Sequence, residues 1–192
     1  MLGHTALMAS PFLYFAGDRL SHAELTAACL DGDLVELGEA YIPADAVETA
    51  ALRAGSLTAV LGDVLAATHL TAAWIHGALP APPARHTVQR AVPRRLHHVP
   101  DRRLVYRDLS VDPADLEVIG GVRVTTPART LADLSRIDDR DHVRAARLLA
   151  GACPGLVDHA IAWLNSHPRH PRKRAALDAL RRFADGQDDV TR

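Results

Sequence analysis

Apolar and polar residues near the start of this chain predict a helix followed by a hairpin. After Ser21 the apolar residues recur at helical spacing, and Ser21 with Glu24 forms a capping box at the helix start. Residues 34–43 then predict two short strands around Gly38. A helix followed by a small hairpin is typical of a winged helix-turn-helix, which we expect over residues 10–43. A helix packed beside a hairpin with no binding role fits this pattern equally well.

The middle of the chain mixes helical and strand patterns. Residues 46–67 are rich in alanine and leucine and predict mostly helix, and residues 69–76 predict another helix. The apolar positions of residues 86–92, 102–109 and 116–124 predict strands. Together these segments predict an antiparallel sheet within an α+β unit.

One stretch, residues 120–134, joins a predicted strand directly to a predicted helix. Val122 and Val124 alternate with polar neighbours, as in a strand with one buried face. Thr126 and Pro127 then predict a helix start, because the threonine hydroxyl can cap free amides and proline lacks an amide that would stay unpaired there. The residues expected in the core are Val124, Leu131 and Leu134. The residues expected to face water are Arg129, Asp133 and Arg136.

The last third of the chain predicts helices only. Residues 142–153 and 156–166 are amphipathic, and Pro171 can be the first residue of a final helix. We therefore expect an α+β protein with a degenerate N-terminal winged helix-turn-helix, followed by a mixed helix and antiparallel-sheet domain with a helical C-terminal end. The expected divisions are residues 1–43, residues 44–184 and a frayed tail at 185–192. Pro80 to Pro83 is expected to be a rigid connector and is the best candidate for a boundary within the chain.

Charge is unevenly distributed along the chain, although the net charge is only −1. Residues 1–80 carry nine acidic side chains and two arginines, whereas residues 81–192 carry 20 basic and 14 acidic side chains. The densest basic run, residues 169–182, has six basic side chains and one aspartate. A solvated helix face explains such a run as well as a surface for nucleic acid or an acidic protein does.

No catalytic or metal-binding pattern is present in the sequence. It contains no nucleophile elbow, P-loop, dinucleotide fingerprint or zinc-protease motif. Cys29 and Cys153 are far apart, and His69 and His76 are seven residues apart rather than four, so neither pair has metal-ligand spacing. We expect a non-catalytic protein without metal or cofactor. Residues 2–15 are too short to span a membrane and have no basic start, so we expect a cytoplasmic protein with no membrane partner.

Three segments resemble the AbiEi-like antitoxins of type IV toxin–antitoxin systems, in their actinobacterial branch. The most specific is the strand–Pro–helix stretch at residues 120–134, GGVRVTTPARTLADL. Residues 67–77, ATHLTAAWIHG, and residues 37–43, LGEAYIP, agree with the family in order and spacing. The resemblance covers roughly residues 10–137. It implies an antitoxin and transcriptional autoregulator, whose winged helix binds operator DNA and whose C-terminal part counters a nucleotidyltransferase-type toxin.

The first domain departs from this family where DNA would be bound. Relatives place arginines on this helix and wing, whereas this chain has Glu24, Asp31, Asp33, Glu36 and Glu39. A carboxylate directed at a phosphate repels it. We therefore expect phosphate contacts from a first basic cluster (Arg94, Arg95, Arg102 and Arg103) and a second basic cluster (Arg169, Arg172, Lys173 and Arg174). The predicted helix after Ser21 would add at most weak base contact, through His22 and Thr26.

Two other functional classes stay open at this point. A relative that does not bind DNA would use the acidic first domain and the basic last part for protein contacts. A metal-dependent nuclease is disfavoured, although some similar chains end in a D…E-x-K metal site. The only lysine here, Lys173, has no carboxylate two residues before it.

Overall fold

The computed structural model describes residues 10–97 and 101–188. Helix α8 ends at Asp188, and the remainder of the tail predicted for residues 185–192 lies outside the described residues. The elements are α1 (His22–Leu30), β1 (Leu34–Leu37), β2 (Ala40–Pro43), α2 (Ala50–Gly55), α3 (Thr58–Leu61), β3 (Leu65–Ala67), α4 (His69–Ile75), β4 (His86–Arg90), β5 (Leu104–Ser110), η1 (Pro113–Asp115), β6 (Leu116–Ile119), β7 (Val122–Thr125), α5 (Pro127–Ser135), α6 (Arg140–Ala152), α7 (Leu156–Ser166) and α8 (Lys173–Asp188).

The N-terminal helix and hairpin form a winged-helix-like unit. The Glu24 amide donates to the Ser21 hydroxyl at 3.3 Å, and the Ser21 amide donates to the Glu24 carboxylate at 2.8 Å, which confirms the predicted capping box. Strands β1 and β2 pair antiparallel around the turn at Gly38. A small core separate from the rest of the molecule holds α1 against this hairpin; its buried residues are Leu25, Leu34 and Tyr41.

A five-stranded sheet in the order β5-β4-β3-β7-β6 forms the centre of the molecule. Strands β3 and β4 pair antiparallel, as do β6 and β7. Strand β4 runs parallel to β5, and β3 runs parallel to β7. The α+β class is confirmed, but the sheet is mixed where the sequence predicted antiparallel pairing. Periodicity in a strand identifies its buried faces and carries no information about the direction of its neighbour.

Strand β3 lies in a segment that the sequence predicted to be helical. Leu65, Ala66 and Ala67 are all buried and occupy the middle of the sheet, between β4 and β7. Such a strand is covered on both faces and shows no alternation, so a run of alanine and leucine cannot distinguish it from a buried helix. The predicted helix at residues 46–67 is therefore wrong at its end, and only α2 and α3 are helical.

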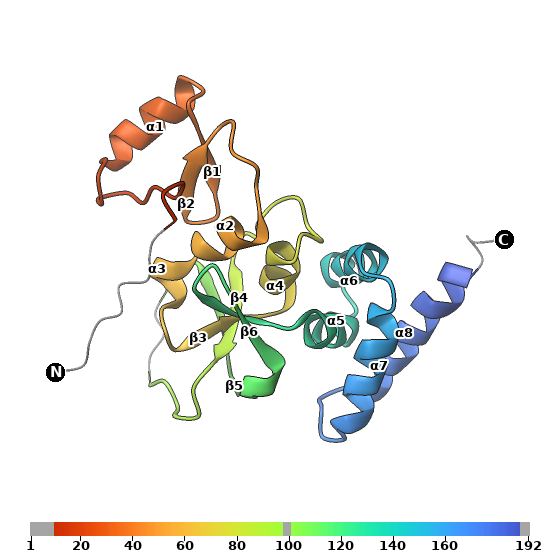
Figure 1. The fold of residues 1–192 in the computed structure, drawn as a ribbon. Helices are drawn as coiled ribbons and strands as arrows, with labels where there is room; N and C mark the ends of the chain where they lie inside the picture. Colours follow the sequence, from red (N-terminus) through yellow and green to blue (C-terminus); the bar gives the residue numbers. More distant parts are fainter. Residues whose placement is uncertain (1–9, 98–100, 189–192) are drawn as a thin grey trace.

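Helix α5 connects the sheet to the helical C-terminal end. It begins at Pro127, directly after β7, as predicted. It packs against α4, α6, α7 and α8, and the three last helices gather around it on one side of the sheet (Figure 1). The last helix begins at Lys173 and not at Pro171, because Arg172 adopts a left-handed φ of 55°.

Two larger cores lie on either side of α4. One fills the space between the sheet, α2, α3 and Trp74 of α4. The other surrounds Leu131 and Leu134 of α5 and extends to Leu180 of α8. Val124, Leu131 and Leu134 are fully buried, as predicted.

The proline-rich segment Pro80 to Pro83 lies within one domain. It connects α4 to β4, and β4 pairs with β3 on the other side of this connection. The segment is therefore a loop within the sheet unit, and the expectation of a boundary there is wrong. Among the described residues, no helix is long and apolar enough to cross a membrane.

Candidate functional site

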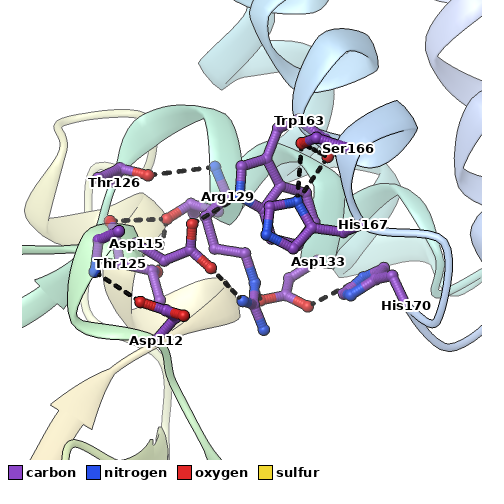
Figure 2. Close-up of polar contacts among 12 residues, drawn as sticks. Asp112, Asp115, Thr125, Thr126, Arg129, Asp133, Trp163, Ser166, His167 and His170 are labelled. Atoms are coloured by element: carbon purple, nitrogen blue, oxygen red, sulfur yellow. Dashed lines mark hydrogen bonds and ion pairs between the residues drawn. The ribbon is translucent and has the colours of Figure 1, made fainter.

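Thr126 and Pro127 begin α5 in an orientation that turns one of its faces toward the interior of the protein. The Thr126 hydroxyl accepts a hydrogen bond from the Arg129 amide at 3.4 Å. Arg129, Asp133 and Arg136 follow at spacings of four and three residues, which places them on one helix face. This face contacts α7 and the loop that follows it, and the prediction that it is exposed to water is wrong (Figure 2).

Asp133 is the centre of this polar face. Its side chain is fully buried and accepts hydrogen bonds from Arg129 Nε at 2.8 Å and from Arg136 Nε at 3.2 Å. Burial by itself raises the pKa of Asp133, but His69 and the two arginines lower the pKa below its ordinary value. Asp133 is therefore a buried carboxylate with two guanidinium partners, as a buried charge requires.

Arg129 joins Asp133 to a second carboxylate, that of Asp115. Its NH1 group lies 2.7 Å from Asp115 Oδ2, and the other oxygen of Asp115 accepts from Trp163 Nε1 at 2.6 Å (Figure 2). The guanidinium also lies over the Trp163 ring, 4.7 Å from its centroid. These contacts connect three separate segments: the turn before β6, α5 and α7.

On the other side, Arg136 joins Asp133 to His69 of α4. Arg136 NH2 lies 2.8 Å from His69 Nε2, and because arginine can only donate, Nε2 accepts. His69 Nδ1 therefore carries the proton and donates to the Thr68 hydroxyl at 2.9 Å. Burial lowers the pKa of His69 to about 3, which is consistent with a neutral ring.

Two further histidines close the network on the side of the α7–α8 loop. His167 stacks on Trp163 with 4.0 Å between ring centroids, and its Nδ1 lies 2.7 Å from the Trp163 carbonyl oxygen. His170 Nε2 lies 3.5 Å from Asp133 Oδ1, and burial lowers the pKa of His170 to about 4. The loop before α8 thus lies beside the same carboxylate that pairs with Arg129 and Arg136.

The two carboxylates of this network connect separate elements of the fold. The oxygens of Asp133 and Asp115 accept from arginine and tryptophan nitrogens, which leaves no carboxylate free for acid–base work. Among the residues that the structure describes, no three histidine, cysteine or acidic side chains are placed to hold a metal ion. Its chemistry is that of a clamp between the sheet and the C-terminal helices.

The first basic cluster lies on both sides of the loop between β4 and β5. Arg94, Arg95 and Arg102 are exposed, and Arg95 Nε lies 3.8 Å from Asp108. Arg103 forms tighter ion pairs, at 2.6 Å with Asp101 and 2.8 Å with Glu39. The four arginines therefore share a region, but Arg103 is already balanced by carboxylates.

The second basic cluster and α1 lie on opposite sides of the molecule (Figure 1). Arg169, Arg172 and Arg174 are exposed in the α7–α8 loop and at the start of α8, with Lys173 half-buried between them. On α1, His22 Nδ1 lies 3.3 Å from the Tyr41 hydroxyl, and the Thr26 hydroxyl donates to the His22 carbonyl at 2.8 Å. The structure thus separates the predicted nucleic-acid residues into three places.

The turn of the β1–β2 hairpin is packed against the sheet domain. Gly38 has a φ of 57°, and a Cβ there would collide with the hydroxyl of Ser56. Glu39 pairs with Arg103 and lies 3.4 Å from His86 Nε2. From the sequence, Glu39 was expected to be a wing residue facing DNA. In the structure it fastens the hairpin turn to the sheet domain, whereas Glu36 is exposed on β1.

A scan against protein-family models matches residues 65–162 to the AbiEi antitoxin C-terminal domain. The match begins at β3 and ends within α7, so it spans the whole five-stranded sheet and the part of the polar network on Asp115, Arg129, Asp133 and Arg136. The chain belongs to the AbiEi antitoxin family. A comparison with curated proteins gave no match. The family resemblance drawn from residues 120–134 is confirmed, and the AbiEi antitoxins are not a known enzyme family.

Two parts of the polar network were not predicted from the sequence: the buried charged face of α5 and the contact of Asp115 with Trp163. The spacing of Arg129, Asp133 and Arg136 on one helix face was a usable signal, because three charged residues at i, i+4 and i+7 can pair only along that face. Asp115 and Trp163 had no such signal, since they come from distant segments that only the packing of α5 on α7 brings together.

Proposed function

We propose that this AbiEi-family antitoxin counters a nucleotidyltransferase-type toxin and represses its own operon by binding operator DNA. The observation that carries the antitoxin role is the family match, which covers the sheet, α4, α5, α6 and the first part of α7. The winged-helix-like unit of α1, β1 and β2 supports the second part of the proposal. We propose neutralisation without catalysis, because the carboxylates of the polar network already accept from arginine and tryptophan nitrogens.

The neutralising activity is tested in cells. The open reading frame next to this gene is expressed with and without the protein, and growth is followed. We expect a nucleotidyltransferase-like neighbour that arrests growth and is countered by coexpression. A neighbour of another class, or a growth arrest that persists beside folded protein, contradicts the proposal. A chain carrying Leu131→Ala, which removes core packing, serves as the destabilised control.

For operator DNA we propose that phosphates are met by the first and second basic clusters. On α1, Thr26 already donates within its own helix and His22 is bonded to Tyr41, so this helix supplies at most weak base contact. The exposed Glu36 would repel phosphates approaching β1. The exposed arginines of the two clusters carry no such opposing charge, apart from Asp108 beside Arg95 and the carboxylates around Arg103.

A salt titration on DNA from upstream of the gene tests this placement. Each neutralised phosphate steepens the log–log dependence of affinity on salt by about 0.9. Replacing Arg172, Lys173 and Arg174 with alanine is expected to flatten the slope, and Glu36→Arg is expected to tighten binding. An unchanged slope in the triple variant, together with loss of binding in His22→Ala, would move the contact back to α1.

A second candidate function is that of a protein-binding relative without DNA affinity. The packing of Gly38 and Glu39 against the sheet domain favours it, because a wing fastened by its turn is less available to DNA. Absence of binding to the upstream DNA even at low salt would support this candidate over the operator contact. The antitoxin role is common to both.

A further inference from the structure

A groove of about 810 Å³ lies between α6 and α8, on the side of α5 away from the sheet. Both helices pack on α5, and the groove opens where they part from each other. Its floor contains small and apolar side chains of α6 and α8, namely Val143, Ala146, Ala150, Ala175, Ala179 and Phe183. The end of α5 and the residues after it add Ser135, Arg136 and Ile137 to the lining. A floor of this kind gains free energy by burying apolar surface and gains nothing from contact with a phosphate.

The rim of this groove is basic. Arg147 of α6 faces it from one side, and Arg172 and Arg182 face it from the other. An adjoining hollow of about 490 Å³ adds Arg140 and Arg144, which lie on the same face of α6 as Arg147 at spacings of four and three residues. None of the three α6 arginines forms an ion pair with a residue that the structure describes. Two aspartates also line the groove; Asp178 lies 3.6 Å from Arg181, and Asp138 lies in the loop between α5 and α6. Asp138 and its neighbour Asp139 also line the adjoining hollow.

Gly151 also lines this groove, and no contact within the fold requires a glycine at this position. It lies in the last turns of α6, and a Cβ added there would meet no atom within 4 Å. A glycine in a helix lowers stability relative to alanine, and here no neighbour forces its use. Because glycine has no side chain, α6 does not project into the groove at this position, and a partner could approach the apolar floor there.

We propose that the groove between α6 and α8 binds an acidic amphipathic helix of a partner protein. The apolar stripe of that helix would lie on the alanine floor, and glutamates or aspartates on its flanks would pair with the arginines of α6 and α8. This is the arrangement by which an amphipathic helix enters a groove, with charge on the rim selecting the partner. The proposal rests on the antitoxin role only for the expectation of a protein partner.

The test uses a synthetic probe and the full chain. A fluorescein-labelled 20-residue peptide with a leucine and alanine face and glutamates on both flanks is titrated by anisotropy. The matched peptide has lysines in place of the glutamates. We expect the acidic peptide to bind at least about tenfold more tightly, because like charges across an interface are unfavourable. Equal affinity for both peptides would overturn the proposal.

Variants of the full chain test separately whether peptide binding depends on the arginines of α6 and on the open space at Gly151. Arg144→Glu with Arg147→Glu is expected to weaken acidic-peptide binding at least about tenfold, while Arg94→Glu with Arg95→Glu makes the same charge change outside the groove and leaves it unchanged. Gly151→Leu is expected to block the groove, and Gly151→Ala is its smaller control. Circular dichroism confirms that each variant is folded.

Two results would overturn the assignment. The first is acidic-peptide binding that survives both Gly151→Leu and the α6 charge reversal. The second is loss of duplex DNA binding, and not of peptide binding, in the charge-reversed chain, which would assign the groove to nucleic acid. The assay needs neither toxin nor operator, so it can fail while the antitoxin role holds, and toxin neutralisation can fail while the peptide binds.

Discussion

At the scale of single residues, Asp133 is the point where the charges of the AbiEi domain converge. Arg129, Arg136 and His170 all approach it, and none of these groups reaches solvent freely. A buried ion pair contributes little in itself, since desolvation offsets much of the attraction. Removing one member is different, because the remaining charges stay buried without a partner.

Asp133→Asn is therefore expected to lower the free energy of unfolding by roughly 3–5 kcal/mol, since Arg129 and Arg136 lose their shared counter-charge. Urea unfolding followed by circular dichroism measures the change. The exposed Asp138, five residues further along, is the matched control, and Asp138→Asn is expected to have little effect. Equal stability of the two variants would show that the network does not hold the fold.

His69 makes stability depend on pH in a defined direction. Its pKa in the folded protein is about 3, below the ordinary value of 6.5, so the unfolded chain takes up the proton first as the pH falls. The stabilising contribution is complete above the ordinary pKa and is lost toward the folded pKa. Its slope reaches at most about 1.4 kcal/mol per pH unit.

We expect His69→Gln to reduce this slope between about pH 6 and pH 4, because the titrating ring is gone while an oxygen can still accept from Arg136. Unfolding free energies measured at several pH values give the slope. His159→Gln, an exposed position on α7, is the control and keeps the slope of the parent. A His69→Gln slope equal to that of His159→Gln would assign the acid sensitivity to other groups.

At the scale of elements, α5 connects the other parts of the domain. Its apolar face lies in the larger helical core. On its polar face, Arg136 donates to His69 of α4, Arg129 lies over the Trp163 ring of α7, and Asp133 lies beside His170 of the loop before α8. The two faces explain why a nine-residue helix with modest propensity is stable: packing and ion pairs on both sides hold it, as is usual for short helices in proteins.

Leu131→Ala is expected to cost roughly 2–5 kcal/mol, because the side chain is fully buried and its removal leaves a cavity. Thermal and urea unfolding provide the measurement. Leu148→Ala on α6 makes the same chemical change at a position whose side chain is 43 % exposed, and is expected to cost much less. A Leu131→Ala chain that melts with the parent would contradict the packing of α5 described above.

At the scale of the whole molecule, the wing and the sheet domain are joined through Glu39 and Arg103. This contact changes what each charged residue can do: Arg103 holds the hairpin turn, whereas Arg94 and Arg102 form no ion pair with described residues. The first basic cluster therefore contains one structural arginine and others that remain available for phosphates.

We expect Arg102→Ala to reduce the salt slope of operator binding by about 0.9 if one phosphate contact is lost, and Arg103→Ala to leave the slope almost unchanged. Arg103→Ala is expected instead to make α1 and the hairpin more sensitive to proteolysis, since their turn loses its ion pair. Salt titration measures the phosphate contact, and limited proteolysis measures the loosening of α1 and the hairpin. A larger decrease of the salt slope in Arg103→Ala than in Arg102→Ala would contradict the assignment of Arg103 to structure and Arg102 to phosphate binding.

The sequence by itself determined the features that depend on neighbouring residues. The capping box at Ser21, the hairpin around Gly38 and the helix start at Pro127 each follow from interactions within a few residues, so local chemistry decided them. The most specific part of the family resemblance also lies in one short stretch, residues 120–134, whose residue types are set by a strand turning directly into a helix.

Only the tertiary structure decided what depends on distant segments. β3 is a strand because β4 and β7 lie on either side of it, and nothing within Leu65–Ala67 distinguishes it from helix. Asp133 is buried because α7 and the loop before α8 cover it, although its polar character predicts exposure. Burial and strand pairing are set by which surfaces meet across the chain, and the pattern along one segment does not contain that information.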